Sequence, residues 1–229
     1  MFLHLIIPAI NEAKNLRALL PYLKRELGVN GKIIVADGGS TDASRRVCDE
    51  LAVTFFASPQ AGRGPQMNAA VMAYPDADLY YFLHADAQPP PGFYQDILNW
   101  TSAGFPVGCY RYTFDSSNPL LKINAFCTRF DALHCRGGDQ SLYVTKAVYE
   151  ELGGFCPQMR IMEDYDIIER AQARYPFKIM PRSLTVSARK YRLNNYFRVQ
   201  LANLIVFRMY RKGASQEAMV RTYRRWLRT

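Results

Sequence analysis

The feature that most constrains the fold is a pattern repeated through the first third of the chain: a short apolar segment, a polar turn and then a helical pattern. Apolar segments without alternating polar residues are typical of strands covered on both faces. Such strands alternating with helices predict an α/β fold with a mostly parallel central sheet. The expected strands are residues 3–8, 32–36, 53–57 and 79–83, and the expected helices are residues 12–26, a segment capped by Ser40 or Thr41 that runs to about Ala52, and residues 63–73.

The alternation weakens after Pro91. We still expect one domain, because 229 residues suffice for a single core and no linker, repeat or low-complexity tract divides the chain. The expected elements of this part are an extended segment at 104–114, helices at 118–133, 144–152 and 163–174, a mixed strand region at 177–188 and two basic helices within 194–228.

Composition indicates an ordinary globular protein, with 49% hydrophobic and 21% charged residues. No apolar run approaches the roughly 18 residues of a membrane-spanning helix, and the N-terminus lacks a signal-peptide pattern, so we expect a cytoplasmic location. The cysteines are odd in number and lack CxxC spacing, which predicts buried free thiols in place of a disulfide framework or a zinc site. They are Cys48, Cys109, Cys127, Cys135 and Cys156.

The positive charge is concentrated at the C-terminus. Residues 189–229 hold 11 of the 29 Lys+Arg but only one of the 20 Asp+Glu, so this segment carries +10 and the rest of the chain −1. A basic segment of this kind suits nucleic acid, an anionic membrane surface or a phosphorylated substrate, and charge alone does not choose among them.

Polar clusters follow three of the expected strands, reading PAINE, DGGSTD and HADA. Ligands of open α/β sheets bind beyond the carboxyl ends of the strands, so we expect these clusters to share one cleft. Asp86 ends the last of them in a loop stiffened by prolines, a suitable position for holding a hard cation against phosphate oxygens. The alternative is a surface acid that only caps the next helix.

Three further segments carry residues suited to chemistry. Asp37 ends a strand and can accept hydrogen bonds from a base or a ribose, although the same residues make a good strand-to-helix turn. Arg63 lies between glycines at a helix start, where its guanidinium and backbone N–H groups suit a phosphate. Glu163, Asp164 and Asp166 lie together at one helix start, and one of them could act as a general base. The alternative is that these acids only stabilise the positive end of the helix dipole.

Six segments in this order resemble the motifs of family 2 glycosyltransferases with the GT-A fold. The likeness is greatest to the small bacterial group labelled arsenosugar-biosynthesis glycosyltransferases, and it covers about residues 5–192. The segments are PAINEAKNL, IIVADGGSTDAS, GRGPQMNAA, FLHADAQPP, GGDQSLYVTKAVYEELGGF and MEDYDIIERAQ.

The resemblance implies a role for each matching residue. Asp86 matches the last acid of the family's DxD motif, which binds a divalent cation, Mn²⁺ or Mg²⁺, on the donor diphosphate. Asp164 matches the catalytic base of inverting transfer, with Glu163 beside it. The other matches are Pro8, Asn11, Glu12 and Asp37 in the nucleotide pocket, Arg63, Arg189 and Arg192 near the diphosphate, and Gly138, Asp139 and Gln140 in the acceptor-side loop.

The implied activity is transfer of a hexosyl group from a nucleotide diphosphate sugar, with a UDP-sugar favoured, to an unidentified acceptor hydroxyl. The implied division of the single domain 1–229 is a nucleotide-binding half at 1–100, an acceptor and catalytic half at 101–190 and basic helices at 191–229. Nucleic acid is disfavoured as a partner, whereas peripheral membrane contact through the basic helices stays open.

Two departures from the family pattern affect these expectations. Position 84 is histidine where many relatives have the first Asp of DxD, which puts metal dependence in question. Tyr191 stands where tryptophan is common, and the alternative for Arg189 and Arg192 is a solvated basic face.

Two other functions compete with glycosyl transfer. A sugar-phosphate nucleotidyltransferase would need a glycine-rich loop after the first strand, and PAINEAKN contains no glycine. A non-catalytic RNA- or membrane-binding protein on the same scaffold would explain the basic tail, but it would have no need of Asp37, Asp86 and Asp164 together.

Overall fold

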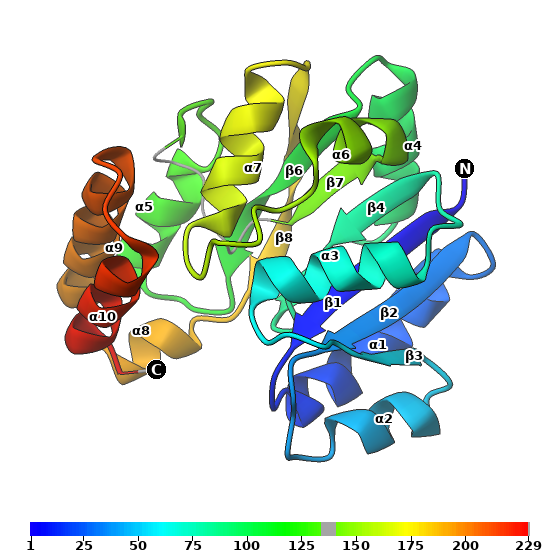
Figure 1. The fold of residues 1–229 in the computed structure, drawn as a ribbon, viewed down its shortest axis with the longest axis horizontal. Coiled ribbons are helices and arrows are strands. Elements are labelled where there is room, and N and C mark those ends of the chain that lie inside the picture. Colours follow the sequence, from blue (N-terminus) through cyan, green and yellow to red (C-terminus); the bar gives the residue numbers. More distant parts are fainter. Residues whose placement is uncertain (134–140, 229) are drawn as a thin grey trace.

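The computed structural model describes residues 1–133 and 141–228. Their strands form one eight-stranded, mostly parallel sheet in the order β3-β2-β1-β4-β7-β6-β8-β5, and helices cover both of its faces (Figure 1). The predicted fold class is therefore confirmed. The strands are β1 (Leu3–Ala9), β2 (Gly31–Asp37), β3 (Thr54–Ala57), β4 (Leu79–Phe82), β5 (Ala87–Gln88), β6 (Val107–Phe114), β7 (Leu142–Thr145) and β8 (Phe177–Val186).

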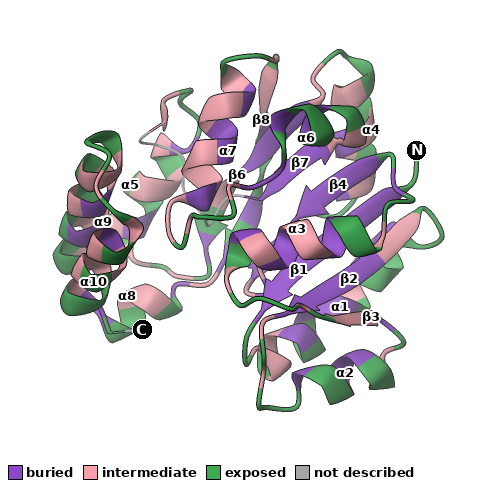
Figure 2. Cartoon of the chain, viewed as in Figure 1, coloured by how far each residue is buried: buried purple, intermediate pink, exposed green. Residues whose placement is uncertain are grey.

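The first half of the sheet is parallel, as the apolar segments predict. β1 lies between β2 and β4, and its last residue, Ala9, aligns with Asp37 at the end of β2. Successive side chains of a strand point to opposite faces. Leu5 and Ile7 accordingly pack in one hydrophobic cluster and Ile6 in the other, so the sheet is buried on both sides (Figure 2).

Each face of the sheet has its own helices. One cluster includes residues of α1, α2, α4 and α5, and the other includes residues of α3, α6 and α7. The helices are α1 (Ala13–Leu27), α2 (Ser44–Glu50), α3 (Arg63–Ala73), α4 (Phe93–Ser102), α5 (Pro119–Cys127), α6 (Lys146–Leu152), α7 (Glu163–Gln172), α8 (Arg189–Leu193), α9 (Tyr196–Arg211) and α10 (Gln216–Trp226).

The second half of the sheet departs from the sequence expectation. The helix predicted at 144–152 begins as strand β7, which runs antiparallel between β4 and β6. Its backbone pairs with these two neighbours while its apolar side chains pack in the clusters on the two faces of the sheet, and this outweighs local helical periodicity. Only residues 146–152 are helical, and they end as predicted at Gly153, which has a φ of 72°.

Two other local predictions were wrong. The helix expected at 118–133 ends at Cys127, where the hydroxyl of Thr128 donates a hydrogen bond of 2.7 Å to the carbonyl of Ala125. Ser40 and Thr41 do not cap α2, which begins at Ser44. The hydroxyl of Ser40 donates a hydrogen bond to the carboxylate of Asp37 instead, so Ser40 belongs to the turn after β2 and does not cap the helix.

The C-terminus forms the two basic helices that the sequence predicts. α9 and α10 pack antiparallel at one edge of the molecule, and we call them, with the turn between them, the C-terminal hairpin (Figure 1). No helix within the described part of the chain is both long and apolar enough to cross a membrane.

The thiol prediction is correct in part. The four cysteines in the described ranges are free, but only Cys48 and Cys109 are buried, while Cys127 and Cys156 are partly exposed. Cys135 lies outside the described residues.

Candidate functional site

The turn after β2 is held by its own carboxylate. Asp37 is buried, and its Oδ2 accepts hydrogen bonds of 2.9 Å from the backbone N–H groups of both Gly39 and Ser40. These contacts are those of a stabilised turn, which is the alternative that the sequence left open. A contact between Asp37 and a nucleotide base stays a prediction.

Asn11 joins the loop after β1 to this turn. Its backbone N–H donates to the hydroxyl of Ser40 (2.8 Å), and its side-chain oxygen accepts from the backbone N–H of Thr41 (2.8 Å). Asn11 has a φ of 55°, a left-handed conformation that asparagine adopts more readily than most residues other than glycine. The two hydrogen bonds of Asn11 hold the first two strand-end loops against each other.

Gln66 is a positioning residue that the sequence analysis missed. It is buried, its Nε2 donates to the carbonyls of Ala9 (3.1 Å) and Ala36 (2.6 Å), and its Oε1 accepts from the N–H of Gly62 (3.1 Å). One side chain thus links the ends of β1 and β2 to the loop before α3. The available signal was a polar residue on the buried face of the predicted helix, next to Met67 and Ala70.

Arg189 connects two of the predicted acids. Its guanidinium donates to both oxygens of Glu12, at 3.1 and 2.7 Å, and its Nε lies 3.1 Å from Oδ2 of Asp86. The hydrogen bond with Glu12 is the main cause of the raised pKa of Arg189. Arg192 lies elsewhere, with its Nη2 at 3.6 Å from Oδ2 of Asp115.

Arg63 connects the other pair of predicted acids. Its Nη1 lies 3.5 Å from Oε1 of Glu163 and 3.9 Å from Oδ2 of Asp164, at the start of α7. Helices α3 and α7 begin close together, since a Cβ added at Gly64 would lie 3.8 Å from the Cβ of Glu163. Met162, just before the two acids, also has a positive φ, of 70°.

His84 lies near both arginines. Burial, together with the positive charges of Arg63 and Arg189, lowers the pKa of His84 to about 3. The imidazole is therefore neutral at physiological pH and adds no charge to the cluster.

The structure brings most of the predicted residues together. We call the cluster of Glu12, Arg63, Asp86, Glu163, Asp164 and Arg189 the strand-end site; Asn11 and Asp37 lie in the adjoining loops, and Pro8 is buried inside β1. Arg192 is not part of the site, and Gly138, Asp139 and Gln140 lie outside the described residues. Residues 1–133 and 141–228 contain no group of three or more His, Cys, Asp or Glu that could by itself hold a metal ion.

The C-terminal hairpin supports the start of α7. Oε1 of Gln216, at the start of α10, accepts from the backbone N–H groups of Arg160 (3.0 Å) and Ile161 (3.2 Å). This loop leads directly into Met162 and the two acids. No local signal in the sequence connects Gln216 to residues more than fifty positions earlier.

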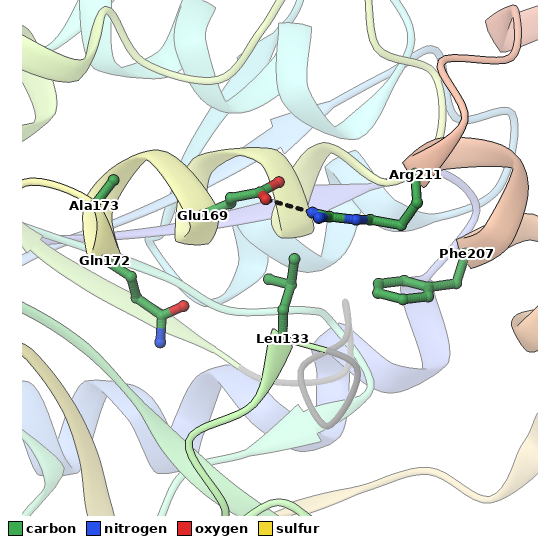
Figure 3. A pocket seen from close by; sticks show the side chains of 6 residues that line it. All are labelled: Leu133, Glu169, Gln172, Ala173, Phe207 and Arg211. Atoms are coloured by element: carbon green, nitrogen blue, oxygen red, sulfur yellow. Dashed lines mark hydrogen bonds and ion pairs between the residues drawn. The ribbon is translucent and has the colours of Figure 1, made fainter.

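A cleft of about 520 Å³ lies between α7 and α9 (Figure 3). One wall is the ion pair between Oε1 of Glu169 and Nη1 of Arg211, which are 2.5 Å apart, and the phenol of Tyr210 also donates to Glu169. No residue predicted from the sequence lines this cleft. Its lining residues are Leu133, Glu169, Gln172, Ala173, Phe207 and Arg211.

Comparison with known sequences identifies a family. The description Glycosyl transferase family 2 applies to the profile that matches residues 4–162, more than half of the chain. A curated relative, the Succinoglycan biosynthesis protein ExoA of Rhizobium meliloti (strain 1021), is 35% identical over 98 residues. That match covers 40% of this chain and 28% of ExoA.

Solved structures share the fold at low sequence identity. TarS 1-349 of S. aureus has a TM-score of 0.67 at 13% identity, covering 97% of this chain and 69% of that one. The mannosyltransferase PcManGT of Pyrobaculum calidifontis, solved with GDP-Man and Mn²⁺, has a TM-score of 0.66 at 16% identity, with 89% and 61% covered. Glucosyl-3-phosphoglycerate synthase of Mycobacterium tuberculosis, solved with Mn²⁺, UDP and glucosyl-3-phosphoglycerate, has a TM-score of 0.60 at 16% identity, with 93% and 80% covered.

Proposed function

Because the chain belongs to glycosyltransferase family 2, we propose that it moves a hexosyl group from a UDP-sugar to an acceptor hydroxyl with inversion. The observation that carries this proposal is the strand-end site, in which acids and arginines from separate segments of the chain meet at the carboxyl ends of β1 and β4. Nucleotide diphosphates bring negative charge and acceptor hydroxyls bring a proton, so a site with both arginines and carboxylates suits the reaction.

Asp164 is the general base of the proposed reaction. Its carboxylate accepts the proton of the acceptor hydroxyl while the hydroxyl oxygen bonds to the anomeric carbon of the sugar. The bond between that carbon and the diphosphate oxygen breaks, and the electron pair leaves with the diphosphate. Attack from the face opposite the leaving group inverts the configuration. Glu163, which is almost fully buried, holds Arg63 beside this position.

Arg63 and Arg189 are placed to offset the charge of the leaving diphosphate. Both reach the site with side chains that are about half exposed, so each can turn from its carboxylate partner toward a bound phosphate. When an arginine turns toward the phosphate, its carboxylate partner loses part of its ion pairing. Nucleotide binding would therefore rearrange the ion pairs of the site.

Asp86 fits a divalent cation if the donor supplies the other oxygens. Mg²⁺ sites commonly combine one or two carboxylates with substrate phosphates. The carboxylate of Asp86 is partly exposed and already pairs with a positive group, Arg189, so the position favours a cation. A bound Mn²⁺ or Mg²⁺ would supply stabilisation of the negative charge on the diphosphate.

Calorimetric titration with UDP and with GDP, each with and without Mn²⁺, tests the proposal. We expect metal-dependent binding of UDP that is tighter than binding of GDP, and a loss of about tenfold or more in Asp86→Asn, because a charge-assisted contact is removed. The matched control is Asp49→Asn, an exposed acid on α2. Failure of both nucleotides to bind, with either metal condition, would contradict the proposal.

Three finer assignments stay predictions. They are membership of the arsenosugar-biosynthesis group, a cytoplasmic location, and the division into halves at residues 1–100 and 101–190. The donor titration tests none of them, because nucleotide affinity reports neither subgroup membership, nor compartment, nor the position at which the chain divides.

A further inference from the structure

The C-terminal hairpin exposes an apolar stripe that its own fold leaves uncovered. Within α9, Val199, Ala202 and Val206 face the interior and are fully buried. Phe197, Leu201 and Leu204 recur at positions i, i+4 and i+7, and they retain 68%, 43% and 47% of their surface exposed. Residues with this spacing share one face of a helix, here the face opposite the buried one.

Helix α5 adds apolar surface beside the start of α9. The side-chain oxygen of Asn124 on α5 accepts a hydrogen bond of 2.8 Å from the phenol of Tyr196, which joins the two helices. Ile123 and Phe126 on α5 are large apolar side chains that are exposed. Five exposed apolar side chains thus lie on two helices that are in contact, α5 and α9, and exposed apolar side chains grouped in this way mark an interaction surface.

The same hairpin carries arginines that no carboxylate compensates. Glu217 is its single acid. In the part of the chain that the structure describes, these exposed arginines of the hairpin make no ion pair: Arg198, Arg208, Arg221, Arg224 and Arg225. Arg198 and Arg208 lie on α9, the helix that carries the apolar stripe, so a partner that fits this helix offers both negative charge and an apolar interior.

We propose that the C-terminal hairpin lies on an anionic lipid surface, with Phe197, Leu201 and Leu204 in the acyl boundary and the arginines among the headgroups. A second copy of this chain is disfavoured because it would bring together two basic hairpins, each with seven Lys+Arg and one Glu within residues 196–226. Nucleic acid would satisfy the arginines but leave the apolar side chains in water. An anionic bilayer satisfies both groups, as in amphipathic helices that lie in the membrane plane.

This attachment would hold the strand-end site near the lipid. Gln216 of the hairpin bonds the loop that precedes Glu163 and Asp164, so a membrane-bound hairpin and the site move together. The membrane proposal itself does not depend on nucleotide binding, and the two can fail separately.

Vesicle co-sedimentation of the full chain tests the proposal. We expect the protein to sediment with vesicles of phosphatidylcholine mixed with phosphatidylglycerol, but not with vesicles of phosphatidylcholine alone. The double variant Leu201→Gln/Leu204→Gln should bind about tenfold more weakly, since the apolar contribution is lost while charge and helix propensity are kept. Arg224→Gln/Arg225→Gln should weaken binding about fivefold per arginine.

The matched control is Met72→Gln, which removes an exposed apolar residue from α3, far from the hairpin. It should sediment like the unmodified chain. Circular dichroism and UDP titration on every variant separate a lost surface contact from a lost fold.

Three results would overturn the proposal. The first is no sedimentation of the unmodified chain with anionic vesicles. The second is unchanged binding by Leu201→Gln/Leu204→Gln, which would leave the stripe without a role. The third is light scattering that finds a dimer which this double variant converts to a monomer, because the stripe would then cover a second copy.

Discussion

Arginine has opposite surroundings in the strand-end site and in the C-terminal hairpin. In the site, Arg63 and Arg189 each face two carboxylates within 4 Å. On the hairpin, arginines such as Arg225 extend into solvent with no carboxylate beside them in the described ranges. An arginine that is paired with carboxylates attracts an anionic ligand only at short range, because the carboxylates offset its charge. A group of arginines without such partners attracts an anionic surface over a distance of about a Debye length.

The largest expected effect comes from the acid that the site would use chemically. Asp164→Asn should lower turnover about 100-fold or more, the scale of lost general-base catalysis, while nucleotide affinity is kept. Turnover is followed as release of UDP or GDP from the donor sugar that supports activity. Asp166→Asn is the control, because Asp166 bonds Arg170 within the same helix and should not touch the acceptor. Full activity in Asp164→Asn would remove this residue from its proposed role.

The next effect concerns the buried hydrogen bonds of Gln66, which join the ends of β1 and β2 beside the strand-end site to the loop before α3. Gln66→Leu leaves the carbonyls of Ala9 and Ala36 and the N–H of Gly62 without their partner, and it should lower the free energy of unfolding by about 1–3 kcal/mol. Urea unfolding measures the change. Gln95→Leu, at an exposed position of α4, should change it by less than about 0.5 kcal/mol. An equal loss of unfolding free energy in the two variants would show that the buried hydrogen bonds of Gln66 add no more stability than an exposed side chain does.

The comparison between the two kinds of arginine can be tested directly. Arg189→Ala should weaken UDP binding about tenfold, because it removes a charge-assisted contact expected with the diphosphate. Arg225→Ala should leave UDP affinity unchanged and weaken only binding to anionic vesicles. Calorimetry and sedimentation on both variants measure the four values. A loss of UDP affinity in Arg225→Ala, or none in Arg189→Ala, would break the distinction.

The smallest expected effect involves a buried histidine. His4 is fully buried, and burial, which outweighs the nearby Asp76 carboxylate, lowers its pKa below the ordinary value of 6.5. The unfolded chain therefore takes up a proton below pH 6.5 more readily than the folded chain, so stability is full above this pH and is lost as the pH falls. His4→Phe should show a shallower decline between about pH 8 and about pH 5 in thermal unfolding. Parallel curves for the two proteins would contradict the lowered pKa.

The sequence determined the parallel half of the fold. The apolar strands of residues 3–8, 32–36 and 79–83 and the helix of residues 63–73 could be predicted because burial on both faces leaves a local pattern. The motifs that resemble the family also located the acids and arginines of the strand-end site. Residues at the ends of neighbouring parallel strands must meet, so their proximity follows from topology.

Only the tertiary structure decided the remainder. β7 is a strand because β4 and β6 pair with it on either side, and its own residues give no sign of these partners. Arg189 and Arg192 are alike in local sequence, yet one pairs with Glu12 and Asp86 and the other with Asp115. The bonds of Gln66 and Gln216 likewise join segments distant in the chain. Such contacts depend on packing between elements, and physical proximity of this kind leaves no periodic signal in the sequence.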